Sequence, residues 1–520
     1  MAPFLGLRGN SLTLAAILGV LMPAILTVGY NTAVLGGVLS VDSFKKSFPE
    51  IDVLHAENPD HASTLEGTVV AAYAIGSFLG TCSVIWLGDV LGRRWTMMTG
   101  AVTQVVAYAL NVTACSLPQL FASRLLIGLG TGVLLATAPL WISETSPAKK
   151  RGSHVVTKGA FSGLGCASAL FLDYGMSFKK NTDLSWRLPF GFPVIFSLAV
   201  FTFAFLLPES PRWLIRKGRT AEAREVLAAL SDTNIHDERI DITIKEVQSS
   251  LDLAGGKSSF KRFFEMGTHR TFHRAALAVG AMIFLQLTGA TVTTFYTTAI
   301  FESNLGLEVS TARLLAGVYQ LVGPLGAVLC VFVIEKAGRR RLMMGSALGN
   351  AVCLACIAGL GSLFDDIKAS HAAVFFLFLF HFTYIVGFGG IPYLYATEIA
   401  PLHLRSTINS VSISISGAFS ILIANMTPLA FNAMGQKYFL VFAGLNVAMT
   451  PVIYFYYPET SGRSLEEIDD IFTLSENALD AVRIARHLPS SPCRQDQEQL
   501  SPIDEKDKNE NVFKEKELQV

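Results

Sequence analysis

The sequence predicts an all-α polytopic membrane protein, with twelve transmembrane helices in two pseudo-symmetric six-helix bundles. The first reason is composition: of 520 residues, 51% are hydrophobic and only 16% are charged, whereas soluble domains are about 25% charged. The second is that the apolar residues gather in runs of about 20, the length that crosses a bilayer as a helix. The third is that short charged motifs recur between these runs in both halves of the chain.

Twelve stretches have the length and low charge expected of membrane-spanning helices. They are Ser11–Ser40, Gly67–Gly88, Trp95–Ser123, Leu125–Ser143, Val155–Met176, Leu188–Leu207, Ala275–Phe301, Leu314–Ile334, Leu342–Phe364, Ala369–Thr397, Ser406–Gln436 and Tyr438–Pro458. The first lacks a basic leading segment and a cleavage site, so we expect a retained helix and not a signal peptide.

The spans divide the chain into five parts. These are an N-terminus (1–10), an N-terminal bundle (11–207), a linker with helices (208–274), a C-terminal bundle (275–458) and a largely disordered acidic tail (459–520). Lys and Arg are in excess in the linker and in the loops after spans two, four, eight and ten, which predicts that this side is cytoplasmic. Both termini are then cytoplasmic, and we expect the plasma membrane as the location.

Several functions are excluded by what the sequence lacks. The 41 basic residues balance the 41 acidic ones, so no overall field favours nucleic acid. We find no catalytic triad, phosphate-binding loop or metal-ligand cluster, and therefore expect no enzyme, no cofactor and no metal. Asn111-Val112-Thr113 is a glycosylation sequon on the outer side, although its closeness to the membrane argues against modification.

Three motifs occur in both halves at an offset of about 250 residues, which indicates a duplicated six-helix unit. They are Gly92-Arg93-Arg94 with Gly338-Arg339-Arg340, Glu144 before Pro147 with Glu398 before Pro401, and Pro208-Glu209 with Pro458-Glu459. Transporters built from such repeats move one half against the other around a site near the midplane.

These motifs, with the run Pro208–Leu214, resemble the sugar porter family of the major facilitator superfamily, fungal type. The resemblance covers roughly residues 11–470. It implies the major facilitator fold, a small-molecule solute, a monomer in the lipid bilayer and, in some members, protons as a second partner.

By this resemblance, charged residues at the cytoplasmic helix ends form ion-pair networks that close that side when the outer side is open. They are Asp89, Arg93, Arg94, Glu144, Arg151, Glu209 and Arg212 in the first half, and Glu335, Arg339, Arg340, Glu398, Arg405 and Glu459 in the second. Glu144 and Glu398 end long helices, where the helix dipole disfavours an anion. We therefore expect each of them to have an arginine partner.

Sugar porters hold their solute with side chains from spans five, seven, eight, ten and eleven. The matching positions here are Gly159, Gln286, Thr291, Phe295, Tyr296, Gly323, Tyr393, Ser416 and Ser420. Gly159 and Leu285 stand where the family has glutamines, and Thr291 stands where it has an asparagine. Because a site without hydroxyl partners loses selectivity for polyols, we expect a larger and less polar pocket than a hexose site.

Two further positions bear on energy coupling. Proton-coupled sugar porters pair an aspartate in span one with an arginine in span four, and here these positions hold Asn31 and Arg124. Asparagine can accept a hydrogen bond from Arg124 but cannot titrate, which favours uniport. If another group carries a proton, Asp173 and His381 are the candidates, because intramembrane ionisable groups are functional candidates by default.

The sequence thus favours a carrier for a small neutral hydroxylated solute, either sugar-like or more apolar, that works by alternating access. Three alternatives stay open: a proton-coupled symporter, an exporter of secondary metabolites, and a nutrient sensor that binds without transport.

Overall fold

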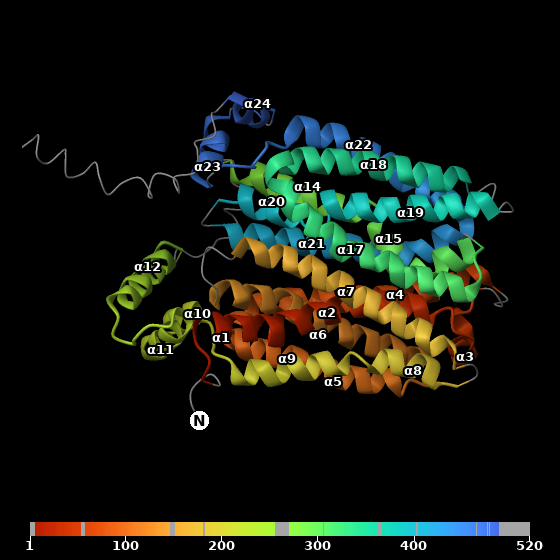
Figure 1. Ribbon diagram of the computed structural model, residues 1–520, viewed down its shortest axis with the longest axis horizontal. Coiled ribbons are helices and arrows are strands. Elements are labelled where there is room, and N and C mark those ends of the chain that lie inside the picture. Colours follow the sequence, from red (N-terminus) through yellow and green to blue (C-terminus); the bar gives the residue numbers. More distant parts are fainter. Residues whose placement is uncertain are drawn as a thin grey trace, which may run out of the picture.

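The computed structural model describes residues 6–487 apart from 54–57, 146–150, 180–181, 255–269, 305, 361–366, 402–403, 464, 476 and 478. The described chain is helical throughout and contains no strand. Long helices run side by side along the length of the molecule, with shorter helices gathered at one end (Figure 1).

Six membrane-length helical segments make up the first half. They are α1–η2–α2 (Gly9–Ala16, Ile17–Leu21 and Met22–Val38), α4 (Pro59–Val90), α5 (Arg93–Val112), α6 (Leu117–Thr145), α7 (Arg151–Ser177) and α8–α9 (Leu184–Gly191 and Val194–Leu206). Two short helices, α3 (Asp42–Ser47) and η3 (Pro49–Ile51), follow the first segment.

Six corresponding segments make up the second half. They are α14–α15–α16–η5 (Thr271–Leu287, Ala290–Phe295, Thr297–Ala299 and Ile300–Asn304), α17 (Val309–Ala337), α18 (Arg339–Leu360), α19–α20 (Ile367–Gly387 and Ile391–Ile399), α21 (Arg405–Met434) and α22 (Tyr438–Tyr456). Gly289, which takes φ 95°, interrupts the first of these segments and turns the chain between α14 and α15.

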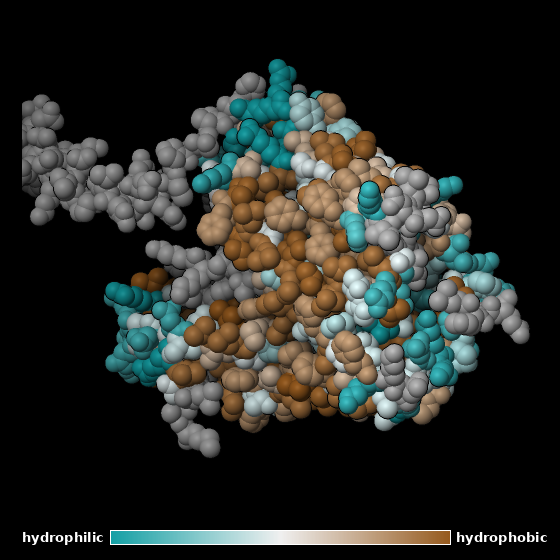
Figure 2. All heavy atoms as spheres, turned by 45° about the vertical axis from the view of Figure 1, so that its right-hand side comes forward, coloured by the Kyte–Doolittle hydropathy of each residue, from teal (hydrophilic) through white to brown (hydrophobic). Residues whose placement is uncertain are grey.

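Eight stretches of the described chain are long and apolar enough to cross a membrane. One of them, Ile408–Tyr456, contains both α21 and α22. Counting these two separately and adding α5, α7 and the segment that begins with α14 gives the twelve spans that the sequence predicts. The surface agrees, because an apolar band covers the middle of the molecule between more hydrophilic ends (Figure 2).

One predicted boundary is wrong. The expected third span, Trp95–Ser123, contains nearly all of α5, then a turn at residues 113–116 and the start of α6. The turn carries no charged residue, so a search for uncharged runs cannot detect it. The fourth span, α6, therefore begins earlier than the uncharged run Leu125–Ser143, and Arg124 lies within it, fully buried.

Five helices outside the spans lie at one end of the bundle, which we call the linker end. Three belong to the linker, α10 (Pro211–Arg216), α11 (Thr220–Ser231) and α12 (Glu238–Ala254), and two follow the last span, α23 (Leu465–Leu474) and α24 (Asp480–His487) (Figure 1). Part of the segment expected to be a disordered tail is therefore helical. Ile468, Ile471 and Phe472 of α23 are buried against the second half, and this apolar face holds the segment in place.

The two halves meet mainly along two helix pairs, α4 with α21 and α7 with α17, and α2 also contacts α15 and α16. Toward the end opposite the linker, which we call the distal end, one buried cluster includes Tyr30 and Phe190 of the first half with Tyr296 and Phe439 of the second. Toward the linker end each half has a cluster of its own. The halves thus share a core at the distal end and have separate cores at the linker end.

Candidate transport site and gates

A polar cluster lies where the second half faces the first. Gln286 of α14 donates a hydrogen bond from Nε2 to Oγ of Ser416 on α21, at 3.0 Å. The hydroxyl of Thr291, just beyond the break at Gly289, donates to the side-chain amide oxygen Oε1 of Gln286. Gly417, next to Ser416, lies against Phe78 of α4 in the first half. Three residues that the sequence assigns to the solute site therefore come together at the boundary between the halves.

The aromatic pair after this cluster is part of the distal closure. Phe295 and Tyr296 are both buried in the core shared by the two halves. The hydroxyl of Tyr296 donates to the carbonyl of Ala424 on α21, at 2.9 Å. The carbonyl of Phe295 lies so close to Gly36 of α2 that a side chain there would collide with it. These contacts close the distal side of the polar cluster.

The other predicted solute residues differ in exposure. Tyr393 on α20 and Ser420 on α21 are half-buried, whereas Gly159 on α7 is exposed and has open space around its Cα. Gly323 on α17 faces Gly163 of α7, with Nε2 of His381 beside it. His381 is buried, its ring lies 4.3 Å from that of Tyr319, and its Nδ1 has no hydrogen-bond partner among the described residues.

Arg124 is fully buried in the first half, and its contacts differ from those expected. Its Nη2 donates to the backbone carbonyl of Asn31 at 3.3 Å, and its guanidinium lies over the rings of Tyr73 and Phe190. The Asn31 side chain accepts nothing from it and instead donates from Nδ2 to the Tyr108 hydroxyl at 2.6 Å. The two rings can stabilise the Arg124 cation. They do so next to Asn31, the position at which proton-coupled sugar porters have an aspartate.

At the linker end each half contains one arginine–glutamate pair. Arg93 binds Glu144 with two hydrogen bonds, Nε to Oε2 at 2.9 Å and Nη2 to Oε1 at 3.0 Å. In the second half Arg339 donates to Glu398 at 3.1 Å, and Glu398 also accepts from the Thr460 hydroxyl. Both pairs join helices of the same half, so in this conformation they do not connect the halves.

Glu209 and Glu459 act differently from the expected ion pairs. The carboxylate of Glu209 accepts hydrogen bonds from the backbone N–H groups of Arg93 and Arg94 at the start of α5. The carboxylate of Glu459 accepts from the same two positions of α18, Arg339 and Arg340. Each glutamate therefore caps a helix N-terminus, where unpaired N–H groups and the helix dipole favour an anion.

Glycine is required at both of these caps. Gly92 and Gly338 precede the capped helices with φ of 88° and 86°, a region that side chains disfavour. A Cβ at Gly92 would lie 2.6 Å from the Glu209 carboxylate, and one at Gly338 would lie 2.5 Å from that of Glu459. Burial raises the pKa of the Glu209 carboxyl, and backbone hydrogen bonds from Ser210, Arg94 and Arg93 oppose this shift.

The other residues of the predicted ion-pair network are either at least partly exposed or have side chains that are not among the described residues. Arg212 is exposed, and Arg405 is half-buried at the start of α21. The side chains of Asp89, Arg151 and Glu335 lie outside the described residues. At the distal end Asn111 is buried and accepts a hydrogen bond from Ser123 at 3.0 Å, so the folded chain does not expose its side chain for glycosylation.

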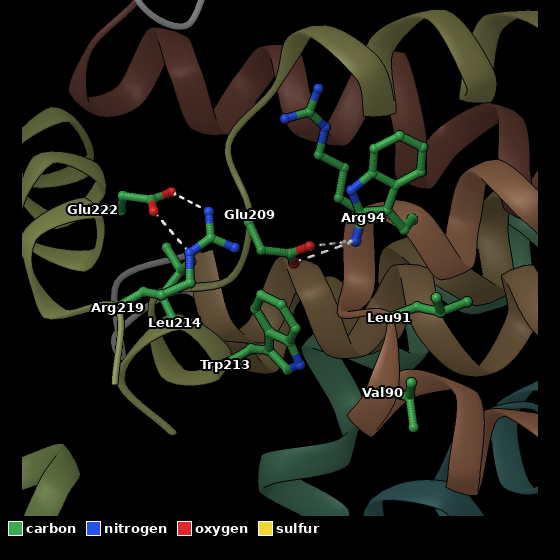
Figure 3. A pocket seen from close by; sticks show the side chains of 9 residues that line it. Val90, Leu91, Arg94, Glu209, Trp213, Leu214, Arg219 and Glu222 are labelled. Atoms are coloured by element: carbon green, nitrogen blue, oxygen red, sulfur yellow. Dashed lines mark hydrogen bonds and ion pairs between the residues drawn. The ribbon is translucent and has the colours of Figure 1, made fainter. Parts of the chain in front are cut away.

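A cavity of about 320 Å³ adjoins the Glu209 cap and is separate from the polar cluster. Trp213, Leu91 and the Arg219–Glu222 ion pair line it (Figure 3). Its walls come from the α4–α5 junction of the first half and from α10 and α11 of the linker, and no residue of the second half lines it. It therefore lies outside the path between the halves.

Several contacts around these sites have no signal in the sequence. Tyr108 binds Asn31 from a helix 77 residues further along the chain. Arg313 of α17 binds Ser40, 273 residues earlier. Asp173, expected only as a possible proton carrier, lies against Gly37 of α2 at the distal end.

The family model "Sugar (and other) transporter" matches residues 15–472 of the chain. The chain belongs to this transporter family. It is therefore a multi-pass membrane protein and not an enzyme, because the family consists of carriers.

Relatives with a curated description are transporters as well. The chain is 30% identical to "Sugar transporter STL1" of Saccharomyces cerevisiae over 471 residues, which cover 89% of this chain and 82% of that one. It is 30% identical to "MFS-type transporter oryC" of Aspergillus oryzae, covering 96% and 93%. It is 27% identical to a quinate permease of Neurospora terricola, covering 92% of each.

Solved structures share the fold. The proton:xylose symporter XylE, bound to 6-bromo-6-deoxy-D-glucose, superposes with a TM-score of 0.73 at 20% identity over 89% of this chain and all of that one. The inward-open form of XylE from E. coli gives a TM-score of 0.72, also at 20% identity, over 89% of this chain and 99% of that one. The chain thus has the major facilitator fold.

We predict that Glu209→Ala lowers the stability of the folded protein, because it leaves the first N–H groups of α5 without their acceptor. The expected loss is about 1–2 kcal/mol, the range for a lost helix cap. Thermal unfolding in lipid nanodiscs measures it. Glu222→Ala is the control, since it removes an exposed ion pair with Arg219, which contributes about 0–1 kcal/mol. Equal losses in the two variants would contradict the capping role.

Proposed function

We propose that the chain carries a small, neutral, hydroxylated solute across the plasma membrane by alternating access, with the linker end and both termini in the cytoplasm. The observation that carries this proposal is the polar cluster of Gln286, Thr291 and Ser416 at the boundary between the halves. Its position suits a solute site, because the halves share a core only on its distal side. With the linker end cytoplasmic, the described conformation faces inward.

The hydrogen bonding of the cluster favours a solute that is less hydroxylated than a hexose. Gln286 donates to Ser416 and accepts from Thr291, and Ser416 donates to the carbonyl of Met282. These groups therefore satisfy much of one another's bonding capacity, and a solute must compete for it. Gly159 and Leu285 add space and an apolar wall where glutamines would add donors and acceptors.

Uniport is the transport mode that the Arg124 site favours. Asn31 cannot exchange a proton, and the contacts of Arg124 among the described residues include the Asn31 carbonyl and the rings of Tyr73 and Phe190, none of which is acidic. Protons stay an alternative through Asp173 or His381, both of which are buried. The symporters among the structural neighbours share only the fold with this chain.

Uptake of a panel of labelled sugars, polyols and cyclic hydroxy acids into proteoliposomes tests the function. Saturable uptake of one class supports a carrier. Thermal stabilisation by a compound that shows no flux in either direction would instead identify a sensor. Flux that is far faster outward than inward, with matched gradients, would favour the exporter.

We predict weak or absent glucose transport by the unmodified chain, because Gly159, Leu285 and Thr291 replace three polar anchors. Glucose affinity should rise about tenfold or more when these residues become Gln, Gln and Asn, since one good hydrogen bond of about 1.4 kcal/mol corresponds to that factor. Gly175→Gln is the control, because Gly175 is another exposed glycine of α7 with open space around it. Micromolar glucose binding by the unmodified chain would contradict the loss of hexose-binding residues from this site.

We also predict that Asn31→Asp makes transport depend on pH. The new carboxylate would lie within reach of the Arg124 guanidinium, and its protonation would change as the site opens to either side. Solute-induced acidification of liposomes measures coupling, with Asn31→Ser as a control that adds no titratable group. Acidification by the unmodified chain would refute uniport, and its loss in Asp173→Asn or His381→Ala would identify the proton carrier.

A further inference from the structure

One arginine of the second half binds the end of a helix in the first half. Arg313 lies in the second turn of α17 and is buried at the distal end. Its Nη2 donates to the backbone carbonyl of Ser40 at 2.7 Å, and its Nε donates to the Ser40 hydroxyl oxygen at 3.1 Å. That hydroxyl in turn donates to the carbonyl of Gly37 at 3.0 Å. Arg313 thus binds the C-terminal end of α2 across the boundary between the halves.

A carboxylate of the first half lies beside the same helix end. Asp173 of α7 is 2% exposed, and neither carboxylate oxygen has a hydrogen-bond partner among the described residues. Its Oδ2 lies so close to Gly37 that a Cβ there would be 2.0 Å away. Arg313 binds Ser40, three residues after Gly37, so it approaches the same helix end from the other half. The α2 C-terminus, with the Asp173 carboxyl beside it, therefore faces one cation of the second half.

The physical consequence is that these charges stabilise one another only while the distal end is closed. A helix C-terminus carries partial negative charge and unpaired carbonyl groups, so a cation there is favourable. Burial without hydrogen bonds disfavours an ionised carboxylate, and a nearby cation offsets part of that penalty. Separation of α17 from α2 and α7 would move Arg313 away from the α2 C-terminus and from Asp173. All three groups would then be exposed to water.

We propose that Arg313, Ser40 and Asp173 form the gate that holds the distal end closed, and that loss of this charge cluster shifts the carrier toward a distal-open state. The proposal rests on the proposed alternating access. It assigns the inter-half charge contact to the distal end, whereas the arginine–glutamate pairs of the linker end join helices within one half.

Another contact between the halves at the same end provides a matched control. Asn432 of α21 donates to the carboxylate of Asp60 on α4 at 2.7 Å, and both residues are exposed. Because solvent screens exposed polar contacts, this one should contribute little to the balance between states. Asn432→Ala therefore removes a cross-boundary hydrogen bond without touching the buried charges.

Cysteine accessibility in the full chain, reconstituted in nanodiscs, tests the gate without any transported solute. Ala424→Cys reports distal opening, because Ala424 is buried in the shared core. Gly159→Cys reports linker-end opening, because Gly159 is exposed on α7, a helix that packs against α17 of the other half. The exposed Cys115 is replaced by serine in every variant. The labelling rate of the same chain without the reporter cysteine is subtracted from each labelling rate.

The expected result is opposite changes at the two reporters. Arg313→Gln and Asp173→Asn should each speed labelling at residue 424 by about tenfold and slow it at residue 159, as expected when a buried charge contact biases two states. Arg313→Lys should recover part of the change, and the double variant should fall short of the product of the two single effects, since both remove one interaction. Asn432→Ala should change either rate by less than about twofold.

Unchanged labelling in both Arg313→Gln and Asp173→Asn would overturn the proposal, as would an equal change in Asn432→Ala. If Arg313→Gln does not fold, Asp173→Asn still decides, because it leaves the Arg313–Ser40 hydrogen bonds in place. These outcomes are separate from the proposed function. A chain that transports none of the tested solutes can still show the shift, and a transporting chain that shows no shift refutes the gate alone.

Discussion

The packing of the two halves against each other at the distal end is the constraint on which the rest of the structure depends. One core there contains residues of both halves, whereas the linker ends have separate cores. Packed interiors do not deform continuously, so a change of access requires this joint core to separate as a unit. The polar cluster of Gln286, Thr291 and Ser416 lies at the boundary that such a movement would open and close.

Each half is built to move as one piece. Glu209 and Glu459 tie the segment after the last helix of each half to the start of its third helix, through backbone N–H groups. The arginine–glutamate pairs join further helices of the same half. Because these contacts are internal, rocking of the halves leaves them intact. The contacts that need to change are those of α2 and α7 with α17, of α2 with α15 and α16, and of α4 with α21.

Much of this architecture could be predicted from the sequence, because the bilayer demands long apolar helices and the duplicated motifs mark their ends. The turn at residues 113–116 could not be predicted from charge, because it contains none. The caps at Glu209 and Glu459 were also missed, since an acidic residue near arginines suggests a side-chain pair and here it binds backbone N–H groups. Helices that are apolar toward both lipid and protein give little sign of which face packs where. For this reason the partners of Asn31 and Arg313, which lie far away in the sequence, emerge only from the structure.

Distances between spin labels at both ends of the molecule test the central claim most directly, which is that the distal end is closed by a shared core while the linker ends separate. Lys217 and Leu474 report the linker end, and Lys179 and Val309 report the distal end, since all four are exposed. The account predicts that a transported solute adds a second population in which the linker-end distance shortens as the distal distance lengthens. Single distance distributions that stay the same at both ends under every transporting condition would contradict it.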